Sequence, residues 1–420
     1  MPVLPLDGVR VADFTQALSG PYCTMLLADL GADVVKVEMP GRGDDSRHWG
    51  PPFVGDTAAY FLAVNRNKRS IELDLRSPSG REAAAALVAN SDVVVENWRP
   101  GTAARLGLDA ATLTERHRRL VHCSISGFGG DGPPRAGYDQ IVQGMSGWMS
   151  LTGGAEGEPF KAGVPVGDIS AGMFAAHGIL AALLKRERTG EGSVVDIAML
   201  DSLVAMLTYQ ATRFFATGVS PLREGNQHAT IAPYGTFPTK DGSLNVCVGN
   251  DLQFQRLCVA LDAPQLGGDP RYQTNPLRLQ HRDELTNEVS EVLRGLTSAD
   301  VLDRLELAGV PAGPIRTLDE VFADDDVQRR GLQLRVDHEQ LGRVSVPGGP
   351  WRIDGVPVSA RLPPPVLGQH TAQILEELAS RSELPTPEKP HSATDQATSD
   401  QATSDQDDVV DAAAAEREVP

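Results

Sequence analysis

The feature that most constrains the fold is a regular alternation of strand-like and helical segments over the first 200 residues. Strands are expected at residues 9–14, 33–38, 92–96, 120–126 and 193–197. Helices are expected between and after them, at residues 20–31, 81–90, 170–188 and 200–207. A repeating strand–helix order favours an α/β fold, in which a parallel sheet is covered by helices.

The predicted helix at residues 170–188 has a well-marked end. Lysine and arginine occupy its last turn and Gly190 follows, as the helix dipole and the geometry of a C-terminal cap favour. Its spacing predicts that Phe174, Leu180 and Leu184 are buried, and His177 is expected to be a core histidine rather than a catalytic base.

The chain of 420 residues is too long for one ordinary core, so we expect more than one domain. The pattern changes at residue 225, after which a strand at 244–248 precedes helices at 251–261, 282–294 and 298–308. We therefore predict a large domain from 1–224 and a smaller one from 225–327. Residues 328–380 contain strand-like segments and a helix at 371–378, but periodicity alone leaves open whether they rejoin the first domain.

The last segment, residues 381–420, repeats SATDQ and ATSDQ and carries ten acidic and three basic side chains. Such a composition predicts a disordered acidic tail. The tail contributes −7 to the formal charge of −18, so the remainder is also acidic and nonspecific nucleic-acid binding is not expected.

The sequence contains neither an apolar run of membrane-spanning length nor an N-terminal signal-peptide pattern. Its four cysteines are far apart and lack metal-ligand spacing, which is typical of reduced thiols. We expect a cytoplasmic protein without a membrane contact or a bound metal.

A glycine pattern at residues 127–132 matches G-x-G-x-x-G after a predicted strand. A dinucleotide site needs a helix to open across the last glycines, but Pro133 and Pro134 follow at once. We interpret the segment as a turn rather than a nicotinamide or flavin site.

Asp168, in the segment GVPVGDISAG before the long predicted helix, has two interpretations. As an N-cap it would accept backbone N–H bonds and stabilise the helix by about 1 kcal/mol. Alternatively, the helix N-terminus keeps its carboxylate ionised, and an ionised carboxylate can attack a thioester carbonyl. Spacing alone favours the N-cap interpretation.

Basic residues gather in the first predicted sheet domain. Most are expected to form a solvated face, but together they could bind phosphate in this acidic protein. They are Arg42, Arg47, Arg66, Lys68, Arg69, Arg76, Arg99 and Arg105. Asn97 and Trp98 follow the strand at 92–96, where parallel-sheet proteins place ligands, and Trp98 could either stack on an adenine or pack in the core.

Several segments, in the same order along the chain, resemble the family III CoA-transferases (the CaiB/BaiF family). They include LSGPYCTMLLADLGADVVKVE, GDDSRHWGPPF, NRNKRSIELDL, VVENWRPG, GYDQIVQGMSG, GVPVGDISAG and LGQHT. The resemblance implies a doubly wound α/β large domain built from both chain ends, a small domain between them and an interlocked homodimer. Coenzyme A is then a substrate and no cofactor is bound permanently.

The resemblance also implies roles for individual residues. Asp168 falls on the family's nucleophilic aspartate and Tyr138 on an active-site tyrosine. The residues that fall on CoA-contacting positions or stretches are Leu73, Arg76, Asn97, Trp98 and Arg105, to which Arg47 of the GDDSRHW segment is added.

The pattern is most similar to that of enzymes exchanging CoA among dicarboxylates such as succinate and glutarate. A glutamine of formyl- and oxalate-type members falls on Leu18, and their glycine-rich lid is replaced by VGNDLQ at residues 248–253, so oxalate-type specificity is not expected. Two alternatives stay open: an α-methylacyl-CoA racemase, although Tyr138 stands where that enzyme has its histidine, and a noncatalytic acyl-CoA-binding protein.

Overall fold

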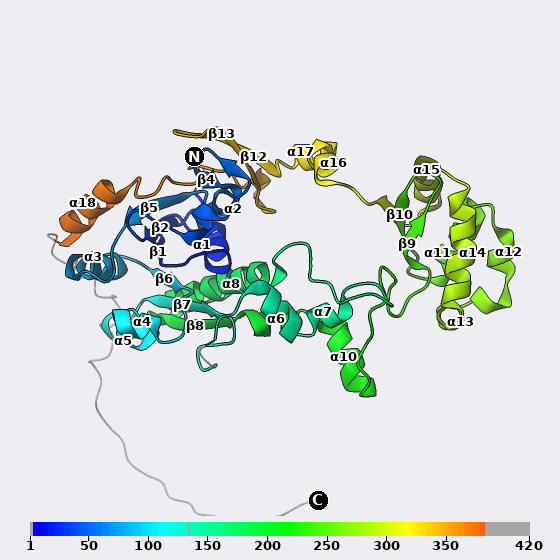
Figure 1. Ribbon diagram of the computed structural model, residues 1–420, viewed down its shortest axis with the longest axis horizontal. Helices are drawn as coiled ribbons and strands as arrows, with labels where there is room; N and C mark the ends of the chain where they lie inside the picture. Colours follow the sequence, from blue (N-terminus) through cyan, green and yellow to red (C-terminus); the bar gives the residue numbers. More distant parts are fainter. Residues whose placement is uncertain (1–2, 133–134, 383–420) are drawn as a thin grey trace, which may run out of the picture.

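A six-stranded parallel sheet forms the centre of the larger part of the molecule (Figure 1). The computed structural model describes residues 3–132 and 135–382. The strand order is β5-β2-β1-β6-β7-β8. The strands are β1 (Arg10–Asp13), β2 (Asp33–Glu38), β5 (Lys68–Glu72), β6 (Val93–Glu96), β7 (Val121–Ser126) and β8 (Ser193–Ala198). The order reverses between β1 and β6, as in a doubly wound fold, so the expected fold class is confirmed.

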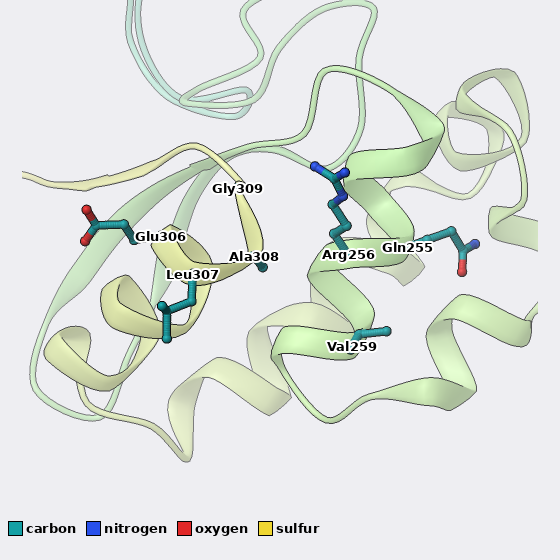
Figure 2. Close-up of a pocket in the computed structure, with 7 residues that line it drawn as sticks. All are labelled: Gln255, Arg256, Val259, Glu306, Leu307, Ala308 and Gly309. Carbon is teal, nitrogen blue, oxygen red and sulfur yellow. The ribbon is translucent and has the colours of Figure 1, made fainter.

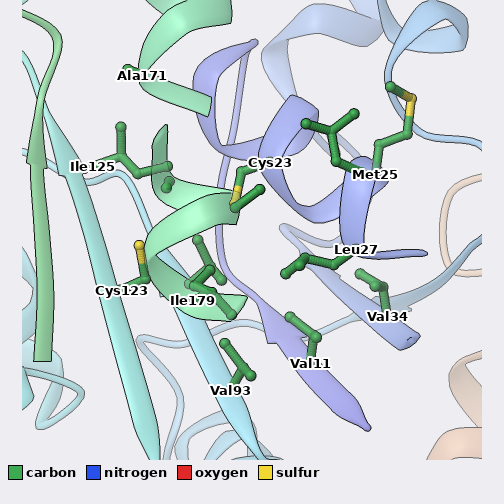
Figure 3. Packing of buried hydrophobic residues seen from close by; sticks show 14 of the residues in the cluster. Val11, Cys23, Met25, Leu27, Val34, Val93, Cys123, Ile125, Ala171 and Ile179 are labelled. Carbon is green, nitrogen blue, oxygen red and sulfur yellow. The ribbon is translucent and has the colours of Figure 1, made fainter. Parts of the chain in front are cut away.

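Alternate residues of these strands contribute to two hydrophobic cores, one on each face of the sheet. Val11 and Val93 pack with α1 (Ser19–Asp29) and α8 (Val166–Thr189) on one face (Figure 3). Their neighbours Ala12 and Val94 pack on the other face with α3 (Pro78–Ala89), α5 (Ala110–Arg116) and α18 (Thr371–Ser382). The sheet is thus covered on both sides.

Helix α8 begins at Val166, four residues before the predicted start. Its buried side is made largely of small residues such as Ala171 and Ala175, so α8 lies close against α1. Phe174 and Leu184 are exposed, with 40% and 57% of their surface accessible, and His177 is exposed as well. The predictions that these three side chains are buried were wrong for the single chain, whereas Leu180 does pack against the core.

Among the described residues, α8 alone is long and apolar enough to cross a membrane by length and composition. Half of its most apolar 18-residue window is buried, and the helix packs against α1 and the sheet.

Strand β5 was not predicted, because its sequence KRSIE contains a single apolar residue. Its basic side chains are accommodated by ion pairs instead. Lys68 lies 3.1 Å from Asp13, and Arg69 contacts Asp33 at 2.7 Å and Glu377 of α18 at 2.8 Å.

The smaller part of the molecule has its own hydrophobic core, formed by residues between 232 and 310. An antiparallel sheet in the order β11-β10-β9 packs against helices. Its elements are β9 (Tyr234–Pro238), β10 (Ser243–Cys247), β11 (Ala312–Pro314), α11 (Asp251–Ala260), α12 (Pro264–Gly268), η2 (Pro270–Tyr272), α13 (Asn275–Gln280), α14 (Arg282–Arg294) and α15 (Ser298–Ala308). The boundaries at 225 and 327 stay a prediction.

The segment after the small domain packs against elements of the larger part of the molecule. The hairpin of β12 (Gln333–His338) and β13 (Gly342–Pro347) packs on Phe61 of α2 (Ala59–Ala63). Ile374 of α18 then joins the sheet core. Helix α18 extends to Ser382, and the rest of the predicted tail lies outside the described residues.

Short elements complete the described chain. They are η1 (Asp45–His48), β3 (Phe53–Val54), β4 (Thr57–Ala58), α4 (Thr102–Leu106), α6 (Asp139–Met145), α7 (Trp148–Leu151), α9 (Met199–Ala205), α10 (Thr208–Thr217), α16 (Leu318–Ala323), α17 (Asp325–Arg329), β14 (Arg352–Ile353) and β15 (Val356–Pro357).

Candidate active site

A cavity of about 490 Å³ lies beyond the carboxyl ends of β1, β6 and β7, where the strand order of the sheet reverses. Ligands of doubly wound α/β proteins bind at this place. The side chains that line it include Gln16, Ala17, Ser19, Trp49, Tyr60, Asn97, Trp98, Arg99, Arg135, Tyr138, Asp139, Lys161 and Asp168.

Asp168 lies in the first turn of α8 and faces this cavity. The N-cap position is Pro165 and no side chain caps the helix, so the N-cap interpretation of Asp168 does not hold. Burial and the nearby carboxylate of Asp139 raise the pKa of Asp168 to about 7, against hydrogen bonds from the hydroxyl and backbone of Ser19 that lower it. A carboxyl with such a pKa exists in both protonation states near neutral pH.

Asp139 begins α6 and was missed by sequence reasoning. Its Oδ1 accepts a 2.8 Å hydrogen bond from the Gly167 N–H, and its Oδ2 accepts one of 2.6 Å from Gln143. The signal was its place in the GYDQIVQ segment, directly after Tyr138. A second missed residue is Tyr60, whose pKa burial and the charges of Asp168 and Asp139 raise to about 12.

Asn97 and Trp98 both line the cavity, where β6 ends. The Asn97 side-chain amide forms two hydrogen bonds with the backbone of Gln16. Its Oδ1 accepts from the Gln16 N–H at 2.9 Å and its Nδ2 donates to the Gln16 carbonyl at 2.8 Å. The Trp98 ring lies 5.6 Å from that of Phe14 and is partly packed against the core. Tyr138 also lines the cavity and is 62% exposed in the single chain.

The other predicted CoA-contacting residues lie outside the cavity lining. Leu73 is buried in the sheet core, Arg76 is exposed and pairs with Asp74 at 2.9 Å, and Arg105 is exposed with a hydrogen bond to Thr102. Because CoA is a long molecule, exposed Arg76 and Arg105 stay predictions. The burial of the Leu73 side chain argues against the contact predicted for it.

The predicted phosphate-binding cluster is largely a set of structural ion pairs. Arg47 is buried, holds both carboxylate oxygens of Glu38 and lies 3.6 Å over the ring of Phe61, which argues against a contact with CoA. Arg66, Lys68 and Arg69 are likewise paired with carboxylates. Of the eight residues in that cluster, Arg99 alone lines the cavity.

Two cations that sequence reasoning did not single out complete the lining. Arg135 lies 3.8 Å over the Phe128 ring, and Lys161 donates to the carbonyl of Ala162. Neither forms an ion pair with a described carboxylate. An anionic substrate would therefore find positive charge beside Asp168.

The glycine-rich segment at residues 127–132 is a turn, as predicted, and no helix opens across it. Gly127 approaches Gly137 so closely that a Cβ on Gly127 would lie 2.5 Å from the Gly137 Cα. The two glycines bring the strand end and the Tyr138 segment together in the cavity wall.

Figure 2 shows a second cavity, of about 620 Å³, in the small domain between α11 and α15. Arg256 and Glu306 contribute charge to it, and Leu307 beside them is 90% exposed. It contains no residue of the Asp168 site, which makes the cavity at the sheet the candidate active site.

The doubly wound sheet and the cavity at its switch point define the class: an α/β protein with a ligand-binding site where the strand order reverses. Comparison with known proteins makes this specific. The family model described as CoA-transferase family III matches residues 6–371. The chain belongs to this family and is a CoA-transferase.

Curated relatives cover nearly the whole chain. Succinate–glutarate CoA-transferase of Agrobacterium fabrum is 44% identical over 91% of this chain and 98% of its own length. Mouse succinyl-CoA:glutarate CoA-transferase is 43% identical over 90% and 87%, respectively. The crystal structure of a CaiB/BaiF family protein from Brucella suis is 42% identical and superposes with a TM-score of 0.80, covering 89% of this chain and 99% of that one.

Proposed function

We propose that this enzyme transfers CoA from succinyl-CoA to glutarate or a related dicarboxylic acid, with Asp168 as covalent nucleophile. The observation that carries the proposal is the state of the Asp168 carboxylate. The buried carboxylates of Asp13, Asp29 and Asp44 lie against a lysine or arginine, whereas no described cation pairs with Asp168, which lines the cavity. An unpaired carboxylate facing a cavity is free to react.

The reaction proceeds in four balanced steps. An Asp168 oxygen attacks the thioester carbonyl of succinyl-CoA, the C–S bond breaks, and an aspartyl–succinyl anhydride and CoA thiolate result. The thiolate attacks the Asp168 carbonyl carbon and expels succinate, leaving an aspartyl-CoA thioester. The acceptor carboxylate attacks that thioester and releases the thiolate, which then takes the acyl group from the new anhydride. No water is consumed and the thioester is conserved.

The cavity suits this sequence in two ways. Retention of CoA beside Asp168 makes the return steps effectively intramolecular, which can contribute about 7–11 kcal/mol in well-oriented cases. Arg99, Arg135 and Lys161 offer cations to the phosphates of CoA and to the distal carboxylate of the acid. The names of the relatives, which act on succinate and glutarate, support a dicarboxylic pair.

An interlocked homodimer is part of the proposal. Large apolar side chains are exposed along α6, α8, β8, α9 and α10 of the single chain. They include Ile141, Met145, Met173, Phe174, Leu184, Val194, Val204, Tyr209, Phe214 and Phe215. Apolar surface of this extent is typical of a protein interface, and light scattering should give twice the mass of one chain. The four unpaired cysteines support a cytoplasmic setting.

The decisive experiment replaces Asp168 by alanine and offers succinyl-CoA with glutarate. We expect transfer to fall by roughly a thousandfold or more because the covalent step is lost. Hydroxylamine should trap an acyl or CoA adduct that mass spectrometry locates at Asp168 of the wild type. Asp300→Ala, which removes an exposed aspartate from the first turn of α15, serves as a control that keeps activity.

Two results would refute the assignment: full transfer by a folded Asp168→Ala protein, or a trapped adduct on another residue. The racemase alternative predicts deuterium uptake at the α-carbon of a 2-methylacyl-CoA without any acceptor acid. The noncatalytic alternative predicts CoA binding without exchange.

A further inference from the structure

Side chains from three parts of the chain hold the turn that follows β1. The N–H groups of three consecutive residues each donate to a side-chain oxygen: Thr15 to Asp13 at 2.9 Å, Gln16 to Asn97 at 2.9 Å, and Ala17 to Asp44 at 3.1 Å. The Thr15 carbonyl accepts a 2.8 Å bond from the Lys36 ammonium. Side chains thus replace the backbone partners that a helix or sheet would supply.

The backbone of Ala17 needs such support. Its φ of +67° lies in the left-handed region, which residues other than glycine rarely adopt. Conformations of this kind persist where the surroundings enforce them, and they are concentrated at functional sites. Ala17 lines the cavity, so the strained backbone is part of the active site.

Lys36 and Asp44 form an ion pair of 2.8 Å, and both side chains are completely buried. Burial alone would raise the pKa of Asp44, but Lys36 and the N–H groups of Ser46 and Ala17 outweigh it and lower that pKa. Neither residue lines the cavity. Because a buried ion pair often contributes little net stability, its value here lies in what it orients.

The turn leads directly to Ser19, the first residue of α1 and a hydrogen-bond donor to Asp168. The approach of the two helices is close: a Cβ on Gly172 of α8 would lie 2.6 Å from the Ser19 carbonyl oxygen. Ser19 is therefore fixed on one side by α8 and on the other by the turn.

We propose that Asp44 and Lys36 are positioning residues for CoA transfer: they fix the turn at residues 15–17 and so hold Ser19 against Asp168. The inference rests on the proposed role of Asp168 as nucleophile. The charged and titratable groups facing Asp168 are Asp139 of α6 and Tyr60 of α2. The same cavity lining contains Arg99, Arg135, Tyr138 and Lys161.

The proposal predicts a shift in pH dependence. The Ser19 donors favour the ionised carboxylate of Asp168, whereas burial and Asp139 oppose it. If the turn relaxes and Ser19 withdraws, the pKa of Asp168 rises further. The acid limb of the pH profile, in which the rate of Asp168 acylation by succinyl-CoA increases with pH, then moves to higher pH.

Two double variants differ in whether residue 44 keeps an acceptor for the N–H groups of Ala17 and Ser46. Lys36→Met with Asp44→Leu removes both charges and the acceptor for the Ala17 N–H. Lys36→Met with Asp44→Asn removes the charges but keeps an acceptor. We expect the leucine variant to shift the acid limb upward and to lower kcat by roughly tenfold, the loss of about one hydrogen bond, with KM for succinyl-CoA unchanged. The asparagine variant loses the Lys36 bond to the Thr15 carbonyl but keeps an acceptor at residue 44, so its acid limb should shift less than that of the leucine variant.

A matched control is the buried pair of Arg66 and Asp29, 2% and 0% exposed. Arg66→Met with Asp29→Leu should affect thermal stability but not the acid limb. Equal acid limbs for the leucine and asparagine variants, or a similar shift in this control, would overturn the proposal. If the leucine variant does not fold, Ser19→Ala should still shift the acid limb of the acylation profile to higher pH. An unchanged acid limb in Ser19→Ala would also overturn the proposal.

The experiment also separates this inference from the proposed function. If Asp168 is not the nucleophile, the wild type itself gives no hydroxylamine-sensitive adduct at that residue. If only the positioning role fails, the wild-type adduct forms and the variants acylate with the wild-type pH dependence.

Discussion

Asp139 holds the helix turn that carries Asp168: its Oδ1 accepts a 2.8 Å hydrogen bond from the N–H of Gly167, the residue directly before Asp168. The first turn of α8 therefore carries the carboxylate of Asp168 and donates a hydrogen bond to that of Asp139. The like charge of Asp139 and the burial of the site raise the pKa of Asp168. A raised pKa keeps part of the Asp168 carboxyl protonated at neutral pH, and several measurable consequences follow from it.

The rate of acylation should depend on pH through Asp168. In the proposed mechanism only the ionised carboxylate attacks the thioester, so kcat/KM for succinyl-CoA should rise with pH and level off above a midpoint of about 7. Initial rates between pH 5 and 9 in constant ionic strength test this, with CoA binding measured in parallel. A midpoint close to 4, the ordinary value for aspartate, would contradict it.

Asp139→Asn should move that midpoint to lower pH. The asparagine oxygen can still accept from the Gly167 N–H, so the start of α8 is preserved, while the like charge that raises the pKa of Asp168 is removed. The same pH series on the variant is the measurement. An upward shift would show that Asp139 acts on Asp168 in some way other than charge repulsion.

Asp168→Asn should stabilise the protein at neutral pH although it abolishes transfer. A carboxyl whose pKa is raised on folding binds more protons in the folded state, so the free energy of unfolding decreases as pH rises from its unfolded pKa to about 7. A neutral side chain at residue 168 removes that loss. The free energy of unfolding of the variant should therefore exceed that of the wild type by roughly 1–3 kcal/mol at pH 8.

Thermal melts of wild type and Asp168→Asn at pH 5 and pH 8 provide the test, with Asp300→Asn as the control. The gain should be larger at pH 8 than at pH 5. A variant less stable than the wild type at pH 8 would be at odds with a raised pKa.

Arg135→Gln should weaken dicarboxylic substrates selectively. If its guanidinium binds the distal carboxylate, KM for glutarate should increase by roughly tenfold, the effect of one charge-assisted hydrogen bond. KM for butyrate, which lacks the second carboxylate, should not change. Arg118→Gln, at an exposed arginine paired with Glu191, is the matched control. An equal increase in KM for both acids would indicate that Arg135 contacts CoA or has a packing role instead.

The sequence predicted those parts of the fold that apolar periodicity encodes. The strands at 33–38 and 92–96 and the helices at 282–294 and 298–308 lie where the pattern placed them, within one residue at each end. Strand β5 escaped because Lys68 and Arg69 are buried by ion pairs with residues far away in the chain. No local pattern reports such pairing.

The candidate site was predicted in part, for a related physical reason. Asp168, Tyr138, Asn97 and Trp98 converge on one cavity because strand ends and helix starts meet at one edge of the sheet. Too many residues of the basic cluster were expected to bind phosphate. A carboxylate that neutralises an arginine, as Glu38 does for Arg47, cannot be found from spacing. Asp139 acts on Asp168, and Asp168 acts on Tyr60, through distances that only the folded chain defines.

The last described helix completes the first sheet: Glu377 of α18 pairs with Arg10 on β1 and Arg69 on β5, and Ile374 enters the core beside them. Loss of α18 would therefore deprive Arg10 and Arg69 of one carboxylate partner and open only part of this face, because α3 and α5 still cover the rest.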